Sequence, residues 1–269
     1  MKINILVSTI DKGIFALDGL LLAPREDVSY IISHQYTSPE FLAVPDHLHR
    51  KDVLVSRMEG RGVTRSRNNA IRLAYADIGV FADDDVVYKW EWLDMLKQTF
   101  EADDALDVAI FKIKTLPGEP EYREYPAESI EYTAAPSVGT IQLAFRVDRV
   151  KERNLAFDER FGAGQKLLIG SDEQIFLHDC IRAGLRVKYF PEYLVQHPFQ
   201  STVKALTKYD DRLNRVTGGL DARMNGWVAL PKAFLGTIKY AGDIFKHGKN
   251  PVSYFIHRFY AALYILITK

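Results

Sequence analysis

The chain has 269 residues, of which 47% are hydrophobic and 26% are charged, which is the composition of a globular protein. Its length suits one large α/β domain or one domain with an appendage. Lys and Arg balance Asp and Glu, 35 against 35, so the net charge gives no indication of nucleic-acid binding. The single cysteine, Cys180, excludes an intrachain disulfide and a cysteine zinc cluster, and we expect a reducing, cytoplasmic location.

Two segments bear on membrane contact. The apolar run at residues 3–7 is too short for a signal peptide, and the longest uncharged apolar run, residues 259–268, is shorter than the roughly 20 residues that span a bilayer. Residues 231–269 carry six Lys or Arg against one Asp, among many aromatic residues. This mixture suits peripheral contact with an anionic membrane at its inner face, and it equally suits packing on the rest of the chain or a homodimer interface.

Strands and helices alternate over the first 115 residues. We predict strands at 3–9, 28–33, 52–56, 78–82 and 108–113, and helices at 13–22, 64–75 and 90–100. This alternation indicates an α/β fold with a mostly parallel central sheet and flanking helices. In the helix at 64–75 the apolar residues Ala70, Ile71, Ala74 and Tyr75 share one face, which we expect to be buried.

The pattern changes after Pro117. Residues 119–131 are polar and predict an excursion or a hairpin, and the alternating residues 140–147 predict a strand of antiparallel direction. A loop at 157–164 precedes a predicted helix at 172–183, which Gly184 closes, and a strand at 186–190. The polar segment 200–230 is predicted to be helical or partly mobile.

The strand at 78–82 ends in three consecutive carboxylates, Asp83, Asp84 and Asp85. A divalent cation would relieve the repulsion between them, and carboxylate oxygens suit Mg²⁺, Mn²⁺ or Ca²⁺. Ligands of open α/β sheets bind at the carboxyl ends of the strands. The triplet therefore predicts a metal and a phosphate-bearing ligand; the alternative is a solvated turn that caps the next helix.

A basic loop precedes the helix that leads into this strand. Residues 60–70 combine two glycines, a helix start and the arginines Arg61, Arg65 and Arg67. A helix N-terminus with arginines nearby is an anion site, so a phosphate bound here would share a site with the metal. The alternative is a basic turn whose arginines pair with surface acids.

Two further positions are candidates for chemistry. Asp172 and Glu173 open a predicted helix, where a carboxylate either caps the helix or serves as a fixed general base for an acceptor hydroxyl. His197 follows a strand and is either a metal ligand or an ordinary packed histidine. Neither position decides between its alternatives in isolation.

The order of these motifs resembles the family 2 glycosyltransferases of the GT-A fold. The series starts with the N-terminal strand and continues with Gly-x-Thr-x-Ser-Arg-Asn, Ala-Asp-Asp-Asp, Phe-Asp-Glu-Arg-Phe-Gly-Ala-Gly, Gly-Ser-Asp-Glu-Gln and Val-x-His-Pro, so the resemblance covers residues 2–198. The resemblance implies a GT-A type nucleotide-diphospho-sugar transferase fold. It implies a catalytic domain at 1–200, with a nucleotide-sugar half (1–115) and an acceptor half (116–200), followed by a helical basic and aromatic extension at 201–269.

The resemblance also implies roles for residues of this sequence. The metal, Mn²⁺ or Mg²⁺, would be held by Asp83, Asp85 and His197. Asp172 matches the catalytic base, with Glu173 beside it, and the acceptor would meet Asp158 and Glu159. The nucleotide sugar, most simply a UDP-sugar, would meet Thr9, Gln35, Arg61, Arg67, Asn68, Asp83 and Asp84. Three positions depart from the family pattern: Gln35 stands where acidic residues usually read uracil, Ser171 replaces a Glu, and Ala70 replaces a Gly.

The implied activity is an inverting, metal-dependent transfer of a sugar from a nucleotide-diphosphate donor to a hydroxyl of a glycan or polyprenyl-linked acceptor, as in surface polysaccharide synthesis. A metal beside Asp85 and Arg67 would stabilise the leaving diphosphate. Two alternatives are a nucleotidyltransferase, which usually has a glycine-rich loop where this chain has Thr9–Gly13, and a non-catalytic protein that binds nucleotides or carbohydrates on the same fold.

Overall fold

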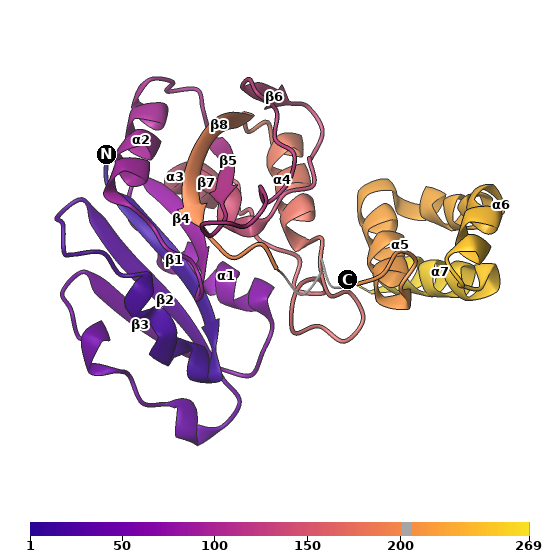
Figure 1. Cartoon of the computed structure of the whole chain (residues 1–269), viewed down its shortest axis with the longest axis horizontal. Helices are drawn as coiled ribbons and strands as arrows, with labels where there is room; N and C mark the ends of the chain where they lie inside the picture. Colours follow the sequence, from indigo (N-terminus) through magenta and orange to yellow (C-terminus); the bar gives the residue numbers. More distant parts are fainter. Residues whose placement is uncertain (201–205, 269) are drawn as a thin grey trace.

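A computed structural model of the chain describes residues 1–200 and 206–268 (Figure 1). The strands are β1 (Ile3–Ile10), β2 (Val28–Tyr36), β3 (Val53–Glu59), β4 (Ile78–Asp83), β5 (Val108–Lys114), β6 (Ile130–Tyr132), β7 (Leu143–Arg146) and β8 (Val187–Gln196). The α-helices are α1 (Val63–Leu73), α2 (Trp90–Glu101), α3 (Val147–Glu152), α4 (Asp172–Arg182), α5 (Asp211–Asn225), α6 (Ala229–Lys246) and α7 (Pro251–Ile267). The 3₁₀ segments are η1 (Asp11–Gly19), η2 (Pro39–Phe41), η3 (Asp46–Leu48), η4 (Thr140–Gln142) and η5 (Gly226–Val228).

One eight-stranded sheet carries the strands in the order β3-β2-β1-β4-β7-β5-β8-β6. The first four strands are parallel, β5 and β8 are parallel, and β7 and β6 run antiparallel to their neighbours. The chain moves outward from β1 to β3 and then returns to β4 on the other side of β1. This reversal makes the β1–β4 junction the switch point, where open α/β sheets bind their ligands.

Both faces of the sheet are covered by helices. One core contains η1 and α2, with Leu93, Leu96 and Phe100 packed against the sheet. The opposite core contains α1, α3 and α4, with Phe176 and Leu177 of α4 fully buried. Coverage on both faces explains why the central strands are continuous hydrophobic runs and not alternating ones. The predicted α/β fold class is confirmed.

The last three helices lie beside the α/β unit, at the end next to α4 (Figure 1). Phe161 and Leu168 of the α/β unit form a small core with Ala222 of α5 and Ala261 of α7. Polar contacts join the same surfaces, since Arg223 of α5 donates to carboxylates of the α/β unit. The helical extension is therefore packed against the acceptor half, as a body of its own helices.

Three details of the prediction are wrong. Residues 13–22 do not form an α-helix but lie largely in the 3₁₀ segment η1, which starts at Asp11 with a φ of 50°. Tyr75 is 67% exposed because α1 ends at Leu73 and the extended Ala74 turns the chain outward. The strand predicted at 186–190 continues through Pro191 to Gln196, because it follows β5 across a register shift.

Other details agree. The strand within 140–147 is antiparallel to both neighbours, and the helix at 172–183 ends at Arg182 before Gly184, whose φ is 79°. The predicted helical segment at 200–230 contains α5, while residues 201–205 lie outside the described residues. The proposed boundary between residues 200 and 201 adjoins this undescribed stretch and stays a prediction.

Candidate functional site

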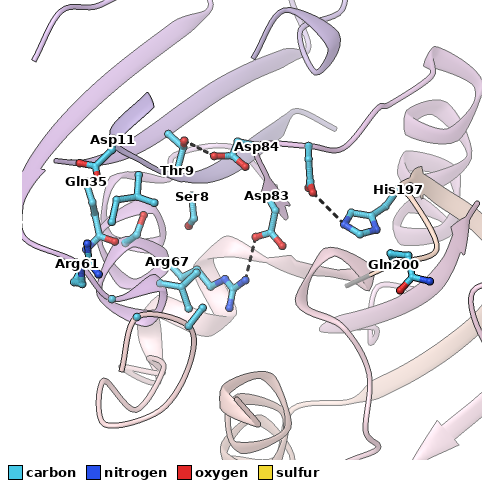
Figure 2. Close-up of a pocket in the computed structure, with 17 residues that line it drawn as sticks. Ser8, Thr9, Asp11, Gln35, Arg61, Arg67, Asp83, Asp84, His197 and Gln200 are labelled. Atoms are coloured by element: carbon cyan, nitrogen blue, oxygen red, sulfur yellow. Dashed lines mark hydrogen bonds and ion pairs between the residues drawn. The ribbon is translucent and has the colours of Figure 1, made fainter. Parts of the chain in front are cut away.

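A cavity of about 770 Å³ opens at the carboxyl ends of β1, β2 and β4 (Figure 2). Strand register brings its walls together: Ser8 pairs with Asp83 across β1 and β4, and Ile10 pairs with Gln35 across β1 and β2. Of the predicted site residues, the cavity is lined by Thr9, Gln35, Arg61, Arg67, Asp83, Asp84, Asp85 and His197. Lining residues that the sequence did not single out include Ser8, Asp11, Ser66 and Gly164. Ser8 could have been found from its place one residue before Thr9, at the same strand end.

Asp84 points to β1, where its Oδ2 accepts a hydrogen bond of 2.5 Å from Thr9 Oγ1. Burial raises the pKa of Asp84, and the neighbouring Asp83 and Asp85 carboxylates raise it further. Gly13 crosses this pair so closely that a Cβ there would lie 2.1 Å from Asp84 Oδ2. Asp84 and Thr9 thus join the chain just after β4 to the end of β1 at the wall of the cavity.

Asp85 faces His197, with 3.3 Å between Asp85 Oδ2 and His197 Nε2. His197 Nδ1 lies 2.6 Å from the carbonyl oxygen of Pro198 and must be the protonated nitrogen that donates to it. Burial lowers the pKa of His197, but the Asp85 carboxylate outweighs burial, and the net shift is upward. The Nε2 atom is therefore directed to Asp85, and a metal bound by both side chains would displace the proton between them.

Arg67 joins two carboxylates. Its Nη2 donates to Asp83 Oδ1 at 3.1 Å, and its Nη1 donates to Asp172 Oδ2 at 2.6 Å. Burial lowers the pKa of Arg67, whereas Asp83 and Asp172 raise it, and the net shift is upward. One guanidinium, held cationic, thus links the cavity to the predicted catalytic base, because Arg67 itself lines the cavity.

Asp172 is almost fully buried behind the loop of residues 161–165. A Cβ at Gly162, whose φ is 101°, would lie 3.1 Å from the Asp172 Cγ, so glycine is needed for the loop to pass this carboxylate. The loop is fastened to the start of α1, since Val63 N donates to the carbonyl oxygen of Ala163. Next to Asp172, burial and the Asp172 charge raise the pKa of Glu173 to about 8.

Two cavity-lining side chains have buried polar atoms without a partner. Ser8 Oγ and Gln35 Nε2 make no hydrogen bond to any of the described residues, although Gln35 is only 2% exposed. An unpaired polar atom costs roughly 1–3 kcal/mol when it is buried, so a partner for either atom would stabilise the cavity wall.

Five predicted residues lie outside the cavity lining: Asp172 and Glu173, described above, and three others. Asn68 makes paired hydrogen bonds with the backbone of Phe157, at 3.0 Å to its oxygen and 2.7 Å from its nitrogen. Glu159 accepts from Asn68 Nδ2 at 3.1 Å. Asp158 accepts from Arg160 and from Arg223 of the helical extension. These three side chains shape the loop between the cavity and the extension, and their predicted binding roles are untested.

The three predicted metal ligands do not form one cluster. Among the residues that the structure describes, no group of three His, Cys, Asp or Glu side chains is arranged to hold a metal ion. Asp85 and His197 adjoin each other, whereas Asp83 is turned to Arg67. Two protein ligands nevertheless fit a Mg²⁺ or Mn²⁺ ion whose other ligands come from substrate phosphates and water.

Comparison with known proteins identifies the family. The model of the Glycosyl transferase family 2 matches residues 16–164, which contain the basic loop and all three consecutive carboxylates. The chain belongs to glycosyltransferase family 2. No curated protein sequence matches it. Membership of family 2 disfavours the nucleotidyltransferase alternative, and it agrees with the position of the cavity at the switch point.

Solved structures of S. aureus TarS show the same fold as this family 2 chain. The TarS 1–349 fragment is 14% identical, with a TM-score of 0.52 over 83% of this chain and 65% of that one. The fragment in complex with UDP is 15% identical, with a TM-score of 0.54 over 86% and 69% of the two chains. The complex with UDP-GlcNAc is 15% identical, with a TM-score of 0.52 over 86% and 70%. The chain spans 39% of a longer TarS structure.

Proposed function

We propose that the cavity binds a nucleoside-diphosphate sugar, and that the protein transfers the sugar with inversion to a hydroxyl of a glycan or lipid-linked acceptor, as in surface polysaccharide synthesis. The observation that carries the proposal is that positively and negatively charged side chains lie together at the carboxyl ends of the strands. Arg67 and Asp85 line the cavity with opposite charges, which suit a metal-bound diphosphate. TarS, a neighbour in fold, has been solved with UDP and with UDP-GlcNAc.

Gln35 is the candidate reader of the base. Its amide has one donor and one acceptor group, which match the N3–H and O4 edge of uracil. Its side chain lines the cavity and its Nε2 has no partner among the described residues, so turning the amide towards a base carbonyl would break no hydrogen bond of Nε2. This contact replaces the acidic residues that family members usually place at the end of the second strand. UDP is therefore the expected carrier.

Asp85 and His197 would hold the metal, Mn²⁺ or Mg²⁺, with the donor diphosphate completing its ligands. The bound ion would supply Lewis-acid stabilisation of the leaving diphosphate. Arg67 contributes a fixed positive charge at the cavity wall, and it keeps Asp83 directed inward through its 3.1 Å hydrogen bond. Asp84 positions the strand end through Thr9.

Asp172 is the better candidate for the base than Glu173. Burial and the Asp172 charge raise the pKa of Glu173, which favours its protonated form. Asp172 carries the ion pair to Arg67, 2.6 Å from Asp172 Oδ2 to Arg67 Nη1, and this pair fixes the direction of its carboxyl group. In the proposed step the acceptor oxygen bonds to the anomeric carbon, the bond from that carbon to the phosphate oxygen breaks, and the hydroxyl proton passes to Asp172. Because Asp172 lies behind Gly162, the loop 161–165 must shift when the acceptor enters.

A second groove, of about 840 Å³, is the candidate acceptor site. Tyr125 and Tyr193 line it, and Lys112 Nζ lies 4.1 Å from the ring centroid of Tyr193. Tyr122 connects the groove to the donor cavity, since its ring meets that of His197 edge to face at 5.9 Å. Aromatic faces bind the apolar faces of sugar rings while their polar edges remain solvated.

The test is a transferase assay with purified protein and a panel of UDP-, GDP- and dTDP-sugars, with Mn²⁺, Mg²⁺ or EDTA. We expect metal-dependent release of UDP, and NMR of the transferred sugar should show an inverted anomeric centre. Release of pyrophosphate would identify a nucleotidyltransferase, binding without turnover would identify a non-catalytic protein, and a retained anomeric centre would contradict the role of Asp172. Tyr193→Ala should raise the acceptor KM while leaving hydrolysis of the donor unchanged.

A further inference from the structure

The outer surface of the helical extension exposes an unusual number of large apolar side chains. Six of them, on η5 and α6, are between 55% and 67% exposed: Trp227, Val228, Phe234, Leu235, Ile238 and Phe245. Single exposed apolar residues are ordinary, but a contiguous group marks an interaction surface. Here the six residues lie between positions 227 and 245, so they form a contiguous surface if they share a face of the helix.

The spacing places three of the six, together with the exposed Pro231, on one face of α6. Pro231, Leu235, Ile238 and Phe245 follow one another at intervals of three, four or seven residues, which is the repeat of one helix face. The opposite face holds Ala233 and Ile244, which are buried against the other helices. The exposed stripe is therefore a second apolar face, on the side of α6 that has no partner among the described residues.

A row of lysines runs beside this stripe. Lys232, Lys239 and Lys246 are all exposed and are seven residues apart. Seven residues make almost two turns, so the three side chains fall within about 40° of one another around the helix axis. Asp243 is the only acidic residue between positions 226 and 269, and Lys208 and Tyr209 already bind its carboxylate. Asp243 lies on the same side of α6, four residues after Lys239 and three before Lys246, but Lys208 adds a further positive charge there, so this side of the helix keeps a net positive charge.

Helix α7 extends the apolar surface. Val252, Ile256 and Tyr260 recur every four residues and are each more than half exposed. Phe255 of α7 meets Phe234 of α6 edge to face, with 6.2 Å between the ring centroids. The two apolar stripes are thus joined into one surface that spans an antiparallel helix pair. We call the exposed residues of η5, α6 and α7 named above, with the three lysines, the docking face.

We propose that the docking face binds the surface of an anionic lipid bilayer, with its apolar side chains in the interfacial region and its lysines on the phosphates. Apolar and aromatic residues flanked by lysines are the signature of helices that lie in the membrane interface. Within the described residues, no helix has the length and hydrophobicity needed to cross a bilayer. The lysine row distinguishes lipid from a second copy of the chain, because two copies of the same row would repel each other across a symmetric interface. The proposal does not depend on the donor site.

The first test is flotation of the full chain with vesicles of phosphatidylglycerol and phosphatidylcholine, compared with phosphatidylcholine alone. We expect binding to the anionic vesicles only, and loss of binding in NaCl of about 1 M, where the Debye length falls to about 3 Å. The triple variant Lys232→Gln, Lys239→Gln, Lys246→Gln should bind at least about tenfold more weakly. A matched triple variant, Lys2→Gln, Lys51→Gln, Lys89→Gln, removes the same charge from exposed positions of the α/β unit and should bind like wild type.

The second test addresses the apolar side chains. The variant Leu235→Gln, Ile238→Gln should lose vesicle binding, whereas Leu54→Gln, Tyr75→Gln, which changes exposed apolar residues of the α/β unit, should keep it. Thermal melting of each variant reports whether it folds. Should either double variant fail to fold, tryptophan fluorescence tests the same proposal. The emission of wild type should shift to the blue when anionic vesicles are added, and this shift should be lost in Trp227→Phe. Failure of wild type to bind anionic vesicles would overturn the proposal, as would a dimer in ultracentrifugation that Leu235→Gln, Ile238→Gln dissociates without any lipid binding.

Discussion

Two buried aspartate–arginine pairs flank the loop that carries Gly162. They differ in the second carboxylate that the arginine binds. Asp172 and Asp158 have similarly buried side chains, 5% and 9% exposed. Arg67 continues from Asp172 to Asp83 and lines the cavity. Arg223 continues from Asp158 to Asp179 of α4, at 2.6 Å, and joins the extension to the α/β unit. The same kind of ion pair thus lies beside the cavity in one case and at the interface with the helical extension in the other. The second carboxylate bound by the arginine makes this difference.

The largest expected effect separates the two candidate bases. Asp172→Asn should lower kcat by roughly 10²–10⁴-fold, because a positioned general base contributes about that much. Affinity for the donor nucleotide should stay within about threefold, since Asp172 does not line the cavity. Glu173→Gln is the matched control and should keep most of its activity. Equal loss in both variants, in steady-state assays at saturating donor, would contradict the assignment of Asp172.

The other aspartate should affect stability and not turnover. Asp158→Asn removes the acceptor for Arg160 and Arg223, and breaking a largely buried ion pair costs about 3 kcal/mol. We expect a lower free energy of unfolding in urea, with kcat per folded molecule unchanged. Asp104→Asn, at a carboxylate that is fully solvent-exposed, should be neutral. A stable Asp158→Asn protein that has lost acceptor binding would instead support the acceptor role that the sequence predicts.

A smaller effect is expected at the base-reading position. Gln35→Ala should weaken UDP binding by about tenfold, which corresponds to about 1.4 kcal/mol, because one hydrogen-bonding contact to the base is lost. Isothermal titration with UDP, GDP and dTDP measures both the loss and the discrimination between bases. Gln98→Ala, at an exposed glutamine of α2, should bind like wild type. Unchanged affinity of Gln35→Ala for UDP would show that the base binds in another part of the cavity.

The smallest expected effect concerns pH. Burial, with a further contribution from Asp172, raises the pKa of Glu173 from 4.5 to about 8. A carboxyl group with a raised pKa stabilises the folded state below its unfolded pKa, and this contribution is lost as the pH rises towards the folded pKa. The melting temperature of wild type should therefore fall relative to that of Glu173→Gln between about pH 5 and pH 8, by a few degrees. Glu91→Gln, at an exposed glutamate, should show no such difference; parallel curves for wild type and Glu173→Gln would show that Glu173 is ionised throughout.

The sequence predicts the sheet well, and it predicts which side chains meet at the β1–β4 junction, because both depend on local signals. Hydrophobic runs mark strands that are buried on both faces, and the residues that follow β1 and β4 must meet at the switch point. Thr9 and Asp84 meet in this way, at 2.5 Å. Turn geometry is harder to predict from the sequence. Residues 13–19 lie in a 3₁₀ segment and not in the predicted α-helix; this segment starts at Asp11, whose φ is positive, and Gly13 passes close to Asp84.

The sequence does not predict which distant residues a side chain contacts. Asp158 and Asp172 both stand in motifs of the family, and nothing in their neighbours indicates that one faces α5 and the other Arg67. The C-terminal aromatics divide in the same way. Tyr254 is buried against the other helices, while Phe245 is 67% exposed, a difference that depends on which face of each helix α5 covers.

The most direct test of a metal-dependent donor site is the thermal stability of wild type and Asp85→Asn with UDP, in Mn²⁺ or in EDTA. A ligand that binds only the folded state at 100 times its Kd stabilises it by about 2.7 kcal/mol. We expect a clear rise in the melting temperature of wild type with UDP and Mn²⁺, a much smaller rise in EDTA, and no metal effect in Asp85→Asn. Absence of any UDP effect on wild type, or an equal effect in Asp85→Asn with Mn²⁺, would contradict a metal-dependent donor site at the end of β4.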